Sequence, residues 1–437
     1  MKLDVENVAK VSRAEVLLEG MTVIAGENGT GKSTVSRALM AIASMSANMK
    51  PLSDSERAAS LLRDAMNPVL MAEGAQVMLR DPLGASRLDH LLDPSLWKDS
   101  SRVRAFLRSV FRQQEQSLFI YPENALKPEG LDRIADEVAK KALRILEIPE
   151  ADYVRYVLEK NMPSAFMGAM AHADGKSPDM RLALVNERFK ISVGFLNGKV
   201  SAFDGWGAKP FQSIFYSEPK NKLDDVDEFA HGRWPRGDRY STNRSLAAQI
   251  LREVPQSESL VESAEYEQTM ELVSQLVNRL HGRLKSKDSK FTFHEQFSSG
   301  AYSVPLLSMA SGVKTMATII RLLENKTILP GGLVIIDEPE SNLHPEYQIL
   351  FAEFLVRLCD ERNIKLLVNT HSPYFLRALQ KFSSSRAVRE RCHYYMMKPD
   401  ESEIAEDVSS RTFHAELKDC NVEEVYSSLA RPLEVVL

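Results

Sequence analysis

Three short segments rich in apolar residues have the character of strands that are buried on both faces. They cover residues 21–25, 333–336 and 365–369, and none of them alternates regularly between polar and apolar positions. Parallel sheets that are covered by helices on both sides give such runs, whereas a sheet with one wet face gives alternation. The pattern therefore predicts an α/β fold with a central sheet.

Helical periodicity follows the first two of these segments. After the first, apolar residues recur at i, i+3, i+4 and i+7, namely at Val35, Ala38, Leu39 and Ile42. After the second, the apolar positions are Tyr347, Leu350, Phe351, Phe354 and Leu358. Each pattern predicts a helix with one buried face, so strand–helix units are expected near both ends of the chain.

The long segment over residues 47–288 has a different pattern. Prolines recur through it, and no heptad repeat is sustained long enough for a coiled coil. Strand-like alternation appears near residues 189–217. We therefore predict a mainly helical insertion at 47–288 with a strand-rich interlude, which divides one lobe into an N-terminal part (1–46) and a C-terminal part (289–437).

A glycine-rich loop directly follows the first predicted strand and matches GxxxxGK[ST] in full. Its backbone amides can face a phosphate, Lys32 can reach the β and γ phosphates, and Ser33 can hold Mg²⁺. A chance glycine-rich turn is the alternative, but the position between a strand and a helix disfavours it. The candidate nucleotide ligands are Gly26, Asn28, Gly29, Thr30, Gly31, Lys32, Ser33 and Thr34.

Two adjacent carboxylates, Asp337 and Glu338, end the second predicted strand. Buried carboxylates are costly unless a cation or a proton offsets them. Asp337 is placed to hold Mg²⁺ and Glu338 to deprotonate an attacking water, and a plain turn at the strand end is the alternative. With the phosphate loop, the pair predicts a site of nucleotide hydrolysis.

Two further candidates follow from position along the chain. His371 ends the third predicted strand, which favours a contact with the γ-phosphate over the usual core or surface role of a lone histidine. Ser311 and Gly312 begin a predicted helix and offer a hydroxyl and free amides to an anion, although simple helix capping explains them equally well.

These elements, in this order, resemble the ATP-binding-cassette (ABC) ATPases of the structural-maintenance, recombination-repair and OLD-like branch. The resemblance covers residues 1 to about 45 and about 289 to 437, and it implies a P-loop core with a mixed sheet flanked by helices. It makes residues 26–34 the Walker A loop, Asp337 and Glu338 the Walker B pair, residues 341–344 the D-loop and His371 the switch histidine. The glutamine loop of the family has three candidates here, Gln76, Gln113 and Gln212.

The resemblance also implies an assembly. In this family the signature of one subunit caps the nucleotide held by another, so Ser311 and Gly312 would complete the site of a neighbouring copy in a head-to-tail homodimer or higher oligomer. The signature departs from the LSGGQ of transporters, since Val313 and Lys314 follow Gly312. A transporter ATPase is therefore disfavoured.

Composition and charge limit the cellular location and the partners that we expect. The net charge of -5 excludes a surface that is basic everywhere, and three widely spaced cysteines fit a reducing compartment. No apolar stretch is long enough for a membrane span and the N-terminus lacks a signal-peptide core, so we expect a cytoplasmic protein with no membrane partner.

Two basic features leave DNA contact open. Arg104, Arg108 and Arg112 would form one stripe on a helix, and residues 233–244 mix arginines with Trp234 and Tyr240. A solvated helix face and an ordered or partner-docking loop are the alternatives.

The resemblance to OLD-like proteins also raises the question of a nuclease domain. Only 66 residues (437 minus 371) follow His371, so we expect no such domain and no nuclease activity in this chain. Asp225 and Asp227 have a suitable spacing, but they lie in an acidic run that favours a solvated surface.

The sequence therefore predicts an ATPase that uses ATP and Mg²⁺. By resemblance to the ATPase subunits of the Septu and PARIS defence systems, ATP-driven assembly would regulate a separate effector, a nuclease or toxin, in bacterial anti-phage defence. The alternative is a DNA-binding clamp ATPase of repair or recombination that needs no effector.

Overall fold

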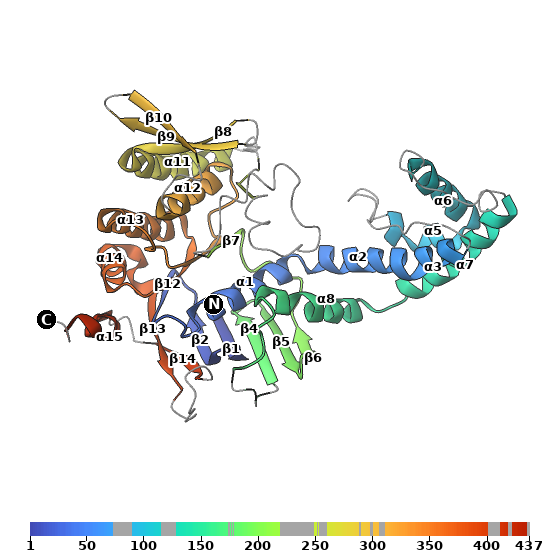
Figure 1. Cartoon of the computed structure of the whole chain (residues 1–437), viewed down its shortest axis with the longest axis horizontal. Helices are drawn as coiled ribbons and strands as arrows, with labels where there is room; N and C mark the ends of the chain where they lie inside the picture. Colours follow the sequence, from blue (N-terminus) through green and yellow to red (C-terminus); the bar gives the residue numbers. More distant parts are fainter. Residues whose placement is uncertain are drawn as a thin grey trace. The chain divides into compact units, whose positions relative to one another are not determined.

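The computed structural model is built around a mixed sheet of eleven strands in the order β6-β5-β4-β1-β2-β14-β13-β3-β12-β11-β7 (Figure 1). Its strands are β1 (Lys2–Val8), β2 (Val11–Leu17), β3 (Met21–Ala25), β4 (Asp179–Val185), β5 (Lys190–Leu196), β6 (Lys199–Asp204), β7 (Ile214–Ser217), β11 (Leu333–Asp337), β12 (Lys365–Thr370), β13 (Cys392–Pro399) and β14 (Phe413–Leu417). Helices flank this sheet, which confirms the predicted α/β class.

The structure describes most of the chain. The described residues are 1–72, 90–114, 128–173, 175, 177, 179–218, 249–250, 252, 260–287, 290–297, 300–305, 311–400, 411–417 and 422–434. Among the helices in these ranges, none combines the length and apolar character that a bilayer span requires.

The parallel part of the sheet holds the three apolar runs seen in the sequence. Strand β12 pairs in parallel with both β3 and β11, and β11 pairs in parallel with β7. All five residues of β3 and all five of β11 are buried. The ends of these strands therefore lie at one edge of the sheet, where the chain leaves β3, β7, β11 and β12.

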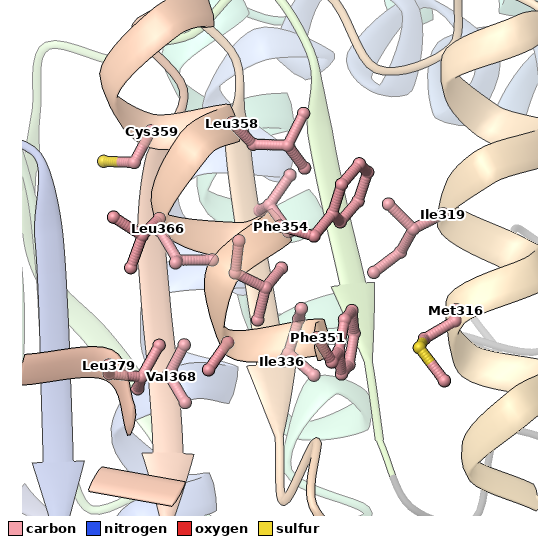
Figure 2. Close-up of a cluster of buried hydrophobic side chains, with 14 of the residues drawn as sticks. Met316, Ile319, Ile336, Phe351, Phe354, Leu358, Cys359, Leu366, Val368 and Leu379 are labelled. Carbon is pink, nitrogen blue, oxygen red and sulfur yellow. The ribbon is translucent and has the colours of Figure 1, made fainter. Parts of the chain in front are cut away.

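Helices pack on the parallel strands and fix this edge. Helix α1 (Lys32–Ala47) contacts β7, β11 and β12. Helices α12 (Ser311–Glu324), α13 (Pro345–Arg362) and α14 (Pro373–Ser383) share a hydrophobic core with the strands. Figure 2 shows Phe351 and Phe354 of α13 in this core between strand residues such as Ile336 and helix α12. At roughly 25 cal/mol per Å² of buried apolar surface, such packing is the main stabilising contribution to the lobe.

Three more elements complete the sheet-containing unit. A separate antiparallel sheet, β10-β9-β8, follows helix α11 (Leu260–Leu280), and helix α15 (Val422–Glu434) packs on α14. The strands of the small sheet are β8 (Gly282–Lys287), β9 (Lys290–Phe297) and β10 (Gly300–Pro305).

The division into units differs from the predicted insertion. One compact unit comprises residues 1–47 and 161–437, and the other comprises residues 48–160. The first boundary lies next to the predicted one, but the chain returns near residue 161 rather than 289. The reason is that β4 pairs antiparallel with β1, so the strands predicted as an interlude extend the main sheet.

Residues 48–160 form a helical unit with its own apolar core, which includes Trp97, Leu107 and Ile134. Its helices are α2 (Met49–Ser60), a π-helical turn at Leu61–Met66, α3 (Asn67–Ala72), α5 (Pro94–Lys98), α6 (Ser100–Gln114), α7 (Pro128–Leu146) and the first part of α8 (Glu150–Ala165). Arg57 donates hydrogen bonds to the carbonyl oxygens of Leu146 and Ile148 and so satisfies the end of α7.

Candidate functional site

The glycine-rich loop joins β3 to α1 and depends on its glycines. Gly26, Gly29 and Gly31 have positive φ angles of +154°, +79° and +93°. A Cβ on Gly31 would lie 2.9 Å from Cγ2 of Val11, so a side chain there would meet both backbone strain and a steric clash. The hydroxyl of Thr30 donates to the carbonyl of Glu27 at 2.9 Å and closes the turn. The first turn of α1 begins at this loop, as an anion site at a helix N-terminus requires.

Lys32 is buried at the start of α1, with 5% of its surface exposed. Its Nζ donates to the carbonyl oxygens of Gly26 and Glu27, each at 2.7 Å. Burial lowers the pKa of Lys32, and the carboxylates of Glu338 and Glu340 oppose that shift. The loop and the end of β11, about 300 residues apart in sequence, therefore share one electrostatic environment.

Asp337 is the last residue of β11 and is 3% exposed. Its Oδ1 accepts a hydrogen bond from Nδ2 of Asn369 at 2.6 Å, and its Oδ2 accepts one from the Tyr216 hydroxyl at 3.0 Å. Burial raises the pKa of Asp337 to about 6, and hydrogen bonds that include one from Ser33 act in the opposite direction. A hydroxyl and a buried carboxylate side by side are oxygen ligands suited to Mg²⁺, so Ser33 and Asp337 fit that ion.

Glu338 has an unusual backbone. Its φ is +50°, a conformation that non-glycine residues adopt at a cost of about 1–3 kcal/mol and that recurs at functional sites. The amide of Glu338 donates to the carbonyl of Asn369 at 2.9 Å, and Ser341 donates to Oε2 of Glu338 at 3.2 Å. Nδ1 of His371 lies 3.6 Å from Oε1 of Glu338. The structure thus brings the candidate base and the candidate switch histidine together.

Sequence reasoning missed several polar residues at this edge. Glu340 is 5% exposed and accepts hydrogen bonds from the hydroxyl of Thr370 at 2.7 Å and from the amide of His371 at 3.1 Å. Asn369 bridges Asp337 and the hydroxyl of Ser36. The only sequence signal was their position at the ends of apolar strands, which the parallel register between β11 and β12 brings together.

Strand β7 delivers another set of polar residues to the same edge. Ser217 pairs with Ile336, so Glu218 comes level with Asp337. Glu218 accepts a hydrogen bond from Nε of Arg37 on α1 at 2.9 Å. Burial and the charge of Asp337 raise the pKa of Tyr216.

Of the three predicted glutamine-loop candidates, Gln212 has a described side chain. Gln212 precedes β7 and lies beside Gly331, before β11 begins, whereas Asp337 ends that strand. Gln76 and the side chain of Gln113 lie outside the described part of the structure. The assignment of the glutamine loop to one of these three residues stays a prediction.

The signature candidates and the predicted basic residues are only partly within the described part of the structure. Ser311 and Gly312 begin α12, but their side chains lie outside the described part of the structure, so their role across a subunit interface stays a prediction. Arg104 is paired with Asp132 and hydrogen-bonded to Ser101, which leaves less of its charge for DNA, and Arg108 is exposed. The side chain of Arg112, residues 233–244, and Asp225 and Asp227 also lie outside that part.

The glycine-rich loop, the carboxylates of β11 and the histidine after β12 define the class: a P-loop ATPase of the ABC type. A family model described as "AAA domain, putative AbiEii toxin, Type IV TA system" matches residues 21–377, and the chain belongs to this family. The match begins at β3 and ends within α14, so it contains every candidate residue of the site.

Individual relatives are similar over shorter stretches. Protein ea59 of Escherichia phage lambda is 30% identical over 151 residues, which are 33% of this chain and 27% of that protein. The OLD nuclease of Thermus scotoductus is 39% identical over 59 residues, 14% of this chain and 11% of that protein. The chain thus matches about a quarter or less of the length of these relatives.

Solved structures are similar only at a distance. The SMC head domain from Thermotoga maritima has a TM-score of 0.36 and 11% identity, with coverage of 96% of this chain and 98% of that one. An SMC head bound to the C-terminal winged-helix domain of ScpA gives 0.39 and 11%, with coverage of 97% and 98%. Likenesses this distant carry no information about what this chain does.

Proposed function

We propose that this chain is an ATPase whose site combines the loop at 26–34 with Asp337, Glu338 and His371. The observation that carries the proposal is that three segments of the chain come together: the carboxylates at and just after the end of β11 favour the charged form of Lys32, and His371 lies 3.6 Å from Glu338. Membership of an AAA-domain family supports the same activity.

The residues divide the chemistry between them. Lys32 and the loop amides would bind the phosphates and neutralise the charge that develops on them. Ser33 and Asp337 would hold Mg²⁺, which supplies charge neutralisation at the β and γ phosphates when bound. Glu338 would accept the proton of the attacking water, and His371 would contact the γ-phosphate.

The experiment is a comparison of phosphate release from Mg-ATP by the wild-type protein and by Glu338→Gln. The variant keeps the shape of the side chain but removes the base, so we expect hydrolysis to fall by about 10² or more while ATP affinity stays within about twofold. Glu346→Gln, at an exposed position on α13, is the matched control and should hydrolyse ATP normally. Normal turnover by Glu338→Gln would refute its role as the base.

We further propose that ATP drives assembly of a homodimer or higher oligomer, with Ser311 and Gly312 of one copy at the nucleotide of the next. The assembly would regulate a separate effector, a nuclease or toxin, in anti-phage defence. Membership of a family described by a putative toxin and a toxin–antitoxin system, and the partial similarity to an OLD nuclease, support this view. Light scattering of Glu338→Gln with and without ATP tests the assembly, and an unchanged mass would contradict it.

A further inference from the structure

Glu340 is a buried carboxylate that the proposed chemistry does not use. It lies three residues after Asp337, and both of its hydrogen bonds are accepted by one oxygen, Oε1. The other oxygen, Oε2, is buried without a hydrogen-bond partner within the described part of the chain. A buried carboxylate with one oxygen unsatisfied is unfavourable for stability, so its presence calls for a role beyond packing.

Both side-chain hydrogen bonds of Glu340 involve residues at or just after the end of β12. Oε1 takes the Thr370 hydroxyl and the His371 amide, and it lies 3.5 Å from Nδ1 of the His371 ring. The same Nδ1 is 3.6 Å from Oε1 of Glu338, and it is buried with no hydrogen bond to any residue that the structure describes. Nδ1 therefore lies close to two carboxylate oxygens, and their negative charge favours a proton on Nδ1 over one on Nε2.

We propose that Glu340 is a positioning residue that holds the backbone and ring of His371 against Glu338. The proposal rests on the roles proposed above for His371 and Glu338. Glu340 itself touches neither the phosphates nor the attacking water in this scheme. Its Oε1 orients the histidine, much as outer carboxylates orient the histidines of metal sites.

A competing explanation is that Glu340 serves Lys32. The carboxylate of Glu340 is one of the charges that favour the ammonium form of Lys32. A residue that acts through Lys32 should change ATP affinity and KM, whereas one that acts through His371 should change kcat. The two roles therefore separate in steady-state kinetics.

The kinetic test uses Glu340→Ala, which removes Oε1, and Glu340→Gln, which keeps an oxygen there and removes only the charge. We expect kcat to fall about tenfold or more in Glu340→Ala and by less than about threefold in Glu340→Gln, with KM for ATP within about twofold in both. Should Glu340→Ala fail to fold, Glu340→Asp withdraws the oxygen with a smaller change. A shift in KM alone, an unchanged kcat in the alanine variant, or an equal loss in both variants would overturn the proposal.

A double-mutant cycle with His371→Ala separates positioning from general structure. If Glu340 acts through His371, removing Glu340 in the His371→Ala background should cost less than about twofold further in kcat. An equal loss in both backgrounds would show that Glu340 does not act through the histidine.

A second measurement needs no nucleotide. Nitrogen NMR of the ¹⁵N-histidine protein at pH 8, with the His371 signal identified by its loss in His371→Ala, reports which ring nitrogen carries the proton. We expect Nδ1–H in the wild-type protein and a shift toward Nε2–H in Glu340→Ala. An unchanged tautomer would refute the positioning role even where ATP hydrolysis is normal, and the expected tautomers would support it even if Lys32→Ala showed the proposed ATP site to be wrong.

Discussion

Two buried cations, one in each unit of the molecule, have opposite surroundings. Arg57 in the helical unit donates to the carbonyls of Leu146 and Ile148 and to Glu150, and its guanidinium lies 4.3 Å from the centre of the Tyr153 ring. The helical unit thus satisfies this charge with its own backbone, a carboxylate and an aromatic face, which is the usual arrangement for a structural buried arginine.

Lys32 in the sheet unit has a poorer environment. Its ammonium donates hydrogen bonds to two carbonyls of its own loop, and burial lowers the pKa of Lys32. Nearby, burial raises the pKa of Asp337. The fold therefore supplies Arg57 with the partners that its charge needs. It leaves Lys32 and the nearby carboxylates in an unfavourable electrostatic state, which a bound ligand could relieve.

The largest effect on stability is expected in the helical unit. Arg57→Ala would leave the carbonyls of Leu146 and Ile148 without this donor and would remove one of the partners of Glu150, which keeps its hydrogen bond from Ser53. We therefore expect the free energy of unfolding to fall by about 2–4 kcal/mol. Chemical denaturation measures this loss. Arg63→Ala is the matched control and should cost less than about 1 kcal/mol, because its exposed guanidinium pairs with Asp64 and Ser60, its neighbours in the chain. A loss of ATP affinity in Arg57→Ala with unchanged stability would show that Arg57 serves nucleotide binding and not the stability of the helical unit.

Removing the charge of Asp337 in the sheet unit should raise the free energy of unfolding instead of lowering it. The folded-state pKa of Asp337, about 6, lies above its ordinary value of 3.8, so ionisation of this group disfavours the folded state. The stability that the neutral carboxyl provides is fully present below pH 3.8 and is lost as the pH rises through 6. Asp337→Asn should therefore stabilise the nucleotide-free protein by about 1–3 kcal/mol at pH 8.

The pH dependence of that gain is the control. At pH 5 the gain should be about half as large, and near pH 4 about a fifth as large, because the wild-type carboxyl is then neutral in the folded state and only partly ionised in the unfolded state. Denaturation at the three pH values, without nucleotide or Mg²⁺, gives the measurement. Destabilisation by Asp337→Asn at pH 8 would show that the carboxylate is a structural group like Arg57.

The smallest effect concerns the orientation of that carboxylate. Tyr216→Phe removes the hydroxyl that donates to Oδ2 of Asp337 and preserves the ring. The lost hydrogen bond to a charged group is worth about 1 kcal/mol. Its loss should raise the Mg²⁺ concentration that gives half-maximal hydrolysis about fivefold and leave kcat within about twofold. A fall in kcat at unchanged Mg²⁺ dependence would contradict this role.

Local sequence patterns predicted the parts of the site that are continuous in the chain. The apolar runs located β3, β11 and β12, and the motif located the loop before α1. The contacts of Asn369, Glu340 and Tyr216 could not be predicted, because they arise from the register of parallel strands that are distant in sequence. The same limit explains why the predicted insertion is longer than the helical unit of the structure, since the pairing of β4 with β1 joins segments far apart in the chain.

The central claim is that Lys32 and the carboxylates of β11 serve one bound Mg-ATP. Calorimetric titration of Mg-ATP into the wild-type protein and Lys32→Ala tests this claim most directly, with Arg57→Ala as a buried-cation control. We predict saturable binding by the wild type and Arg57→Ala, and an affinity at least about 100-fold weaker, or some 2.7 kcal/mol, for Lys32→Ala. Equal affinities of the wild type and Lys32→Ala, or no binding by the wild type, would contradict it.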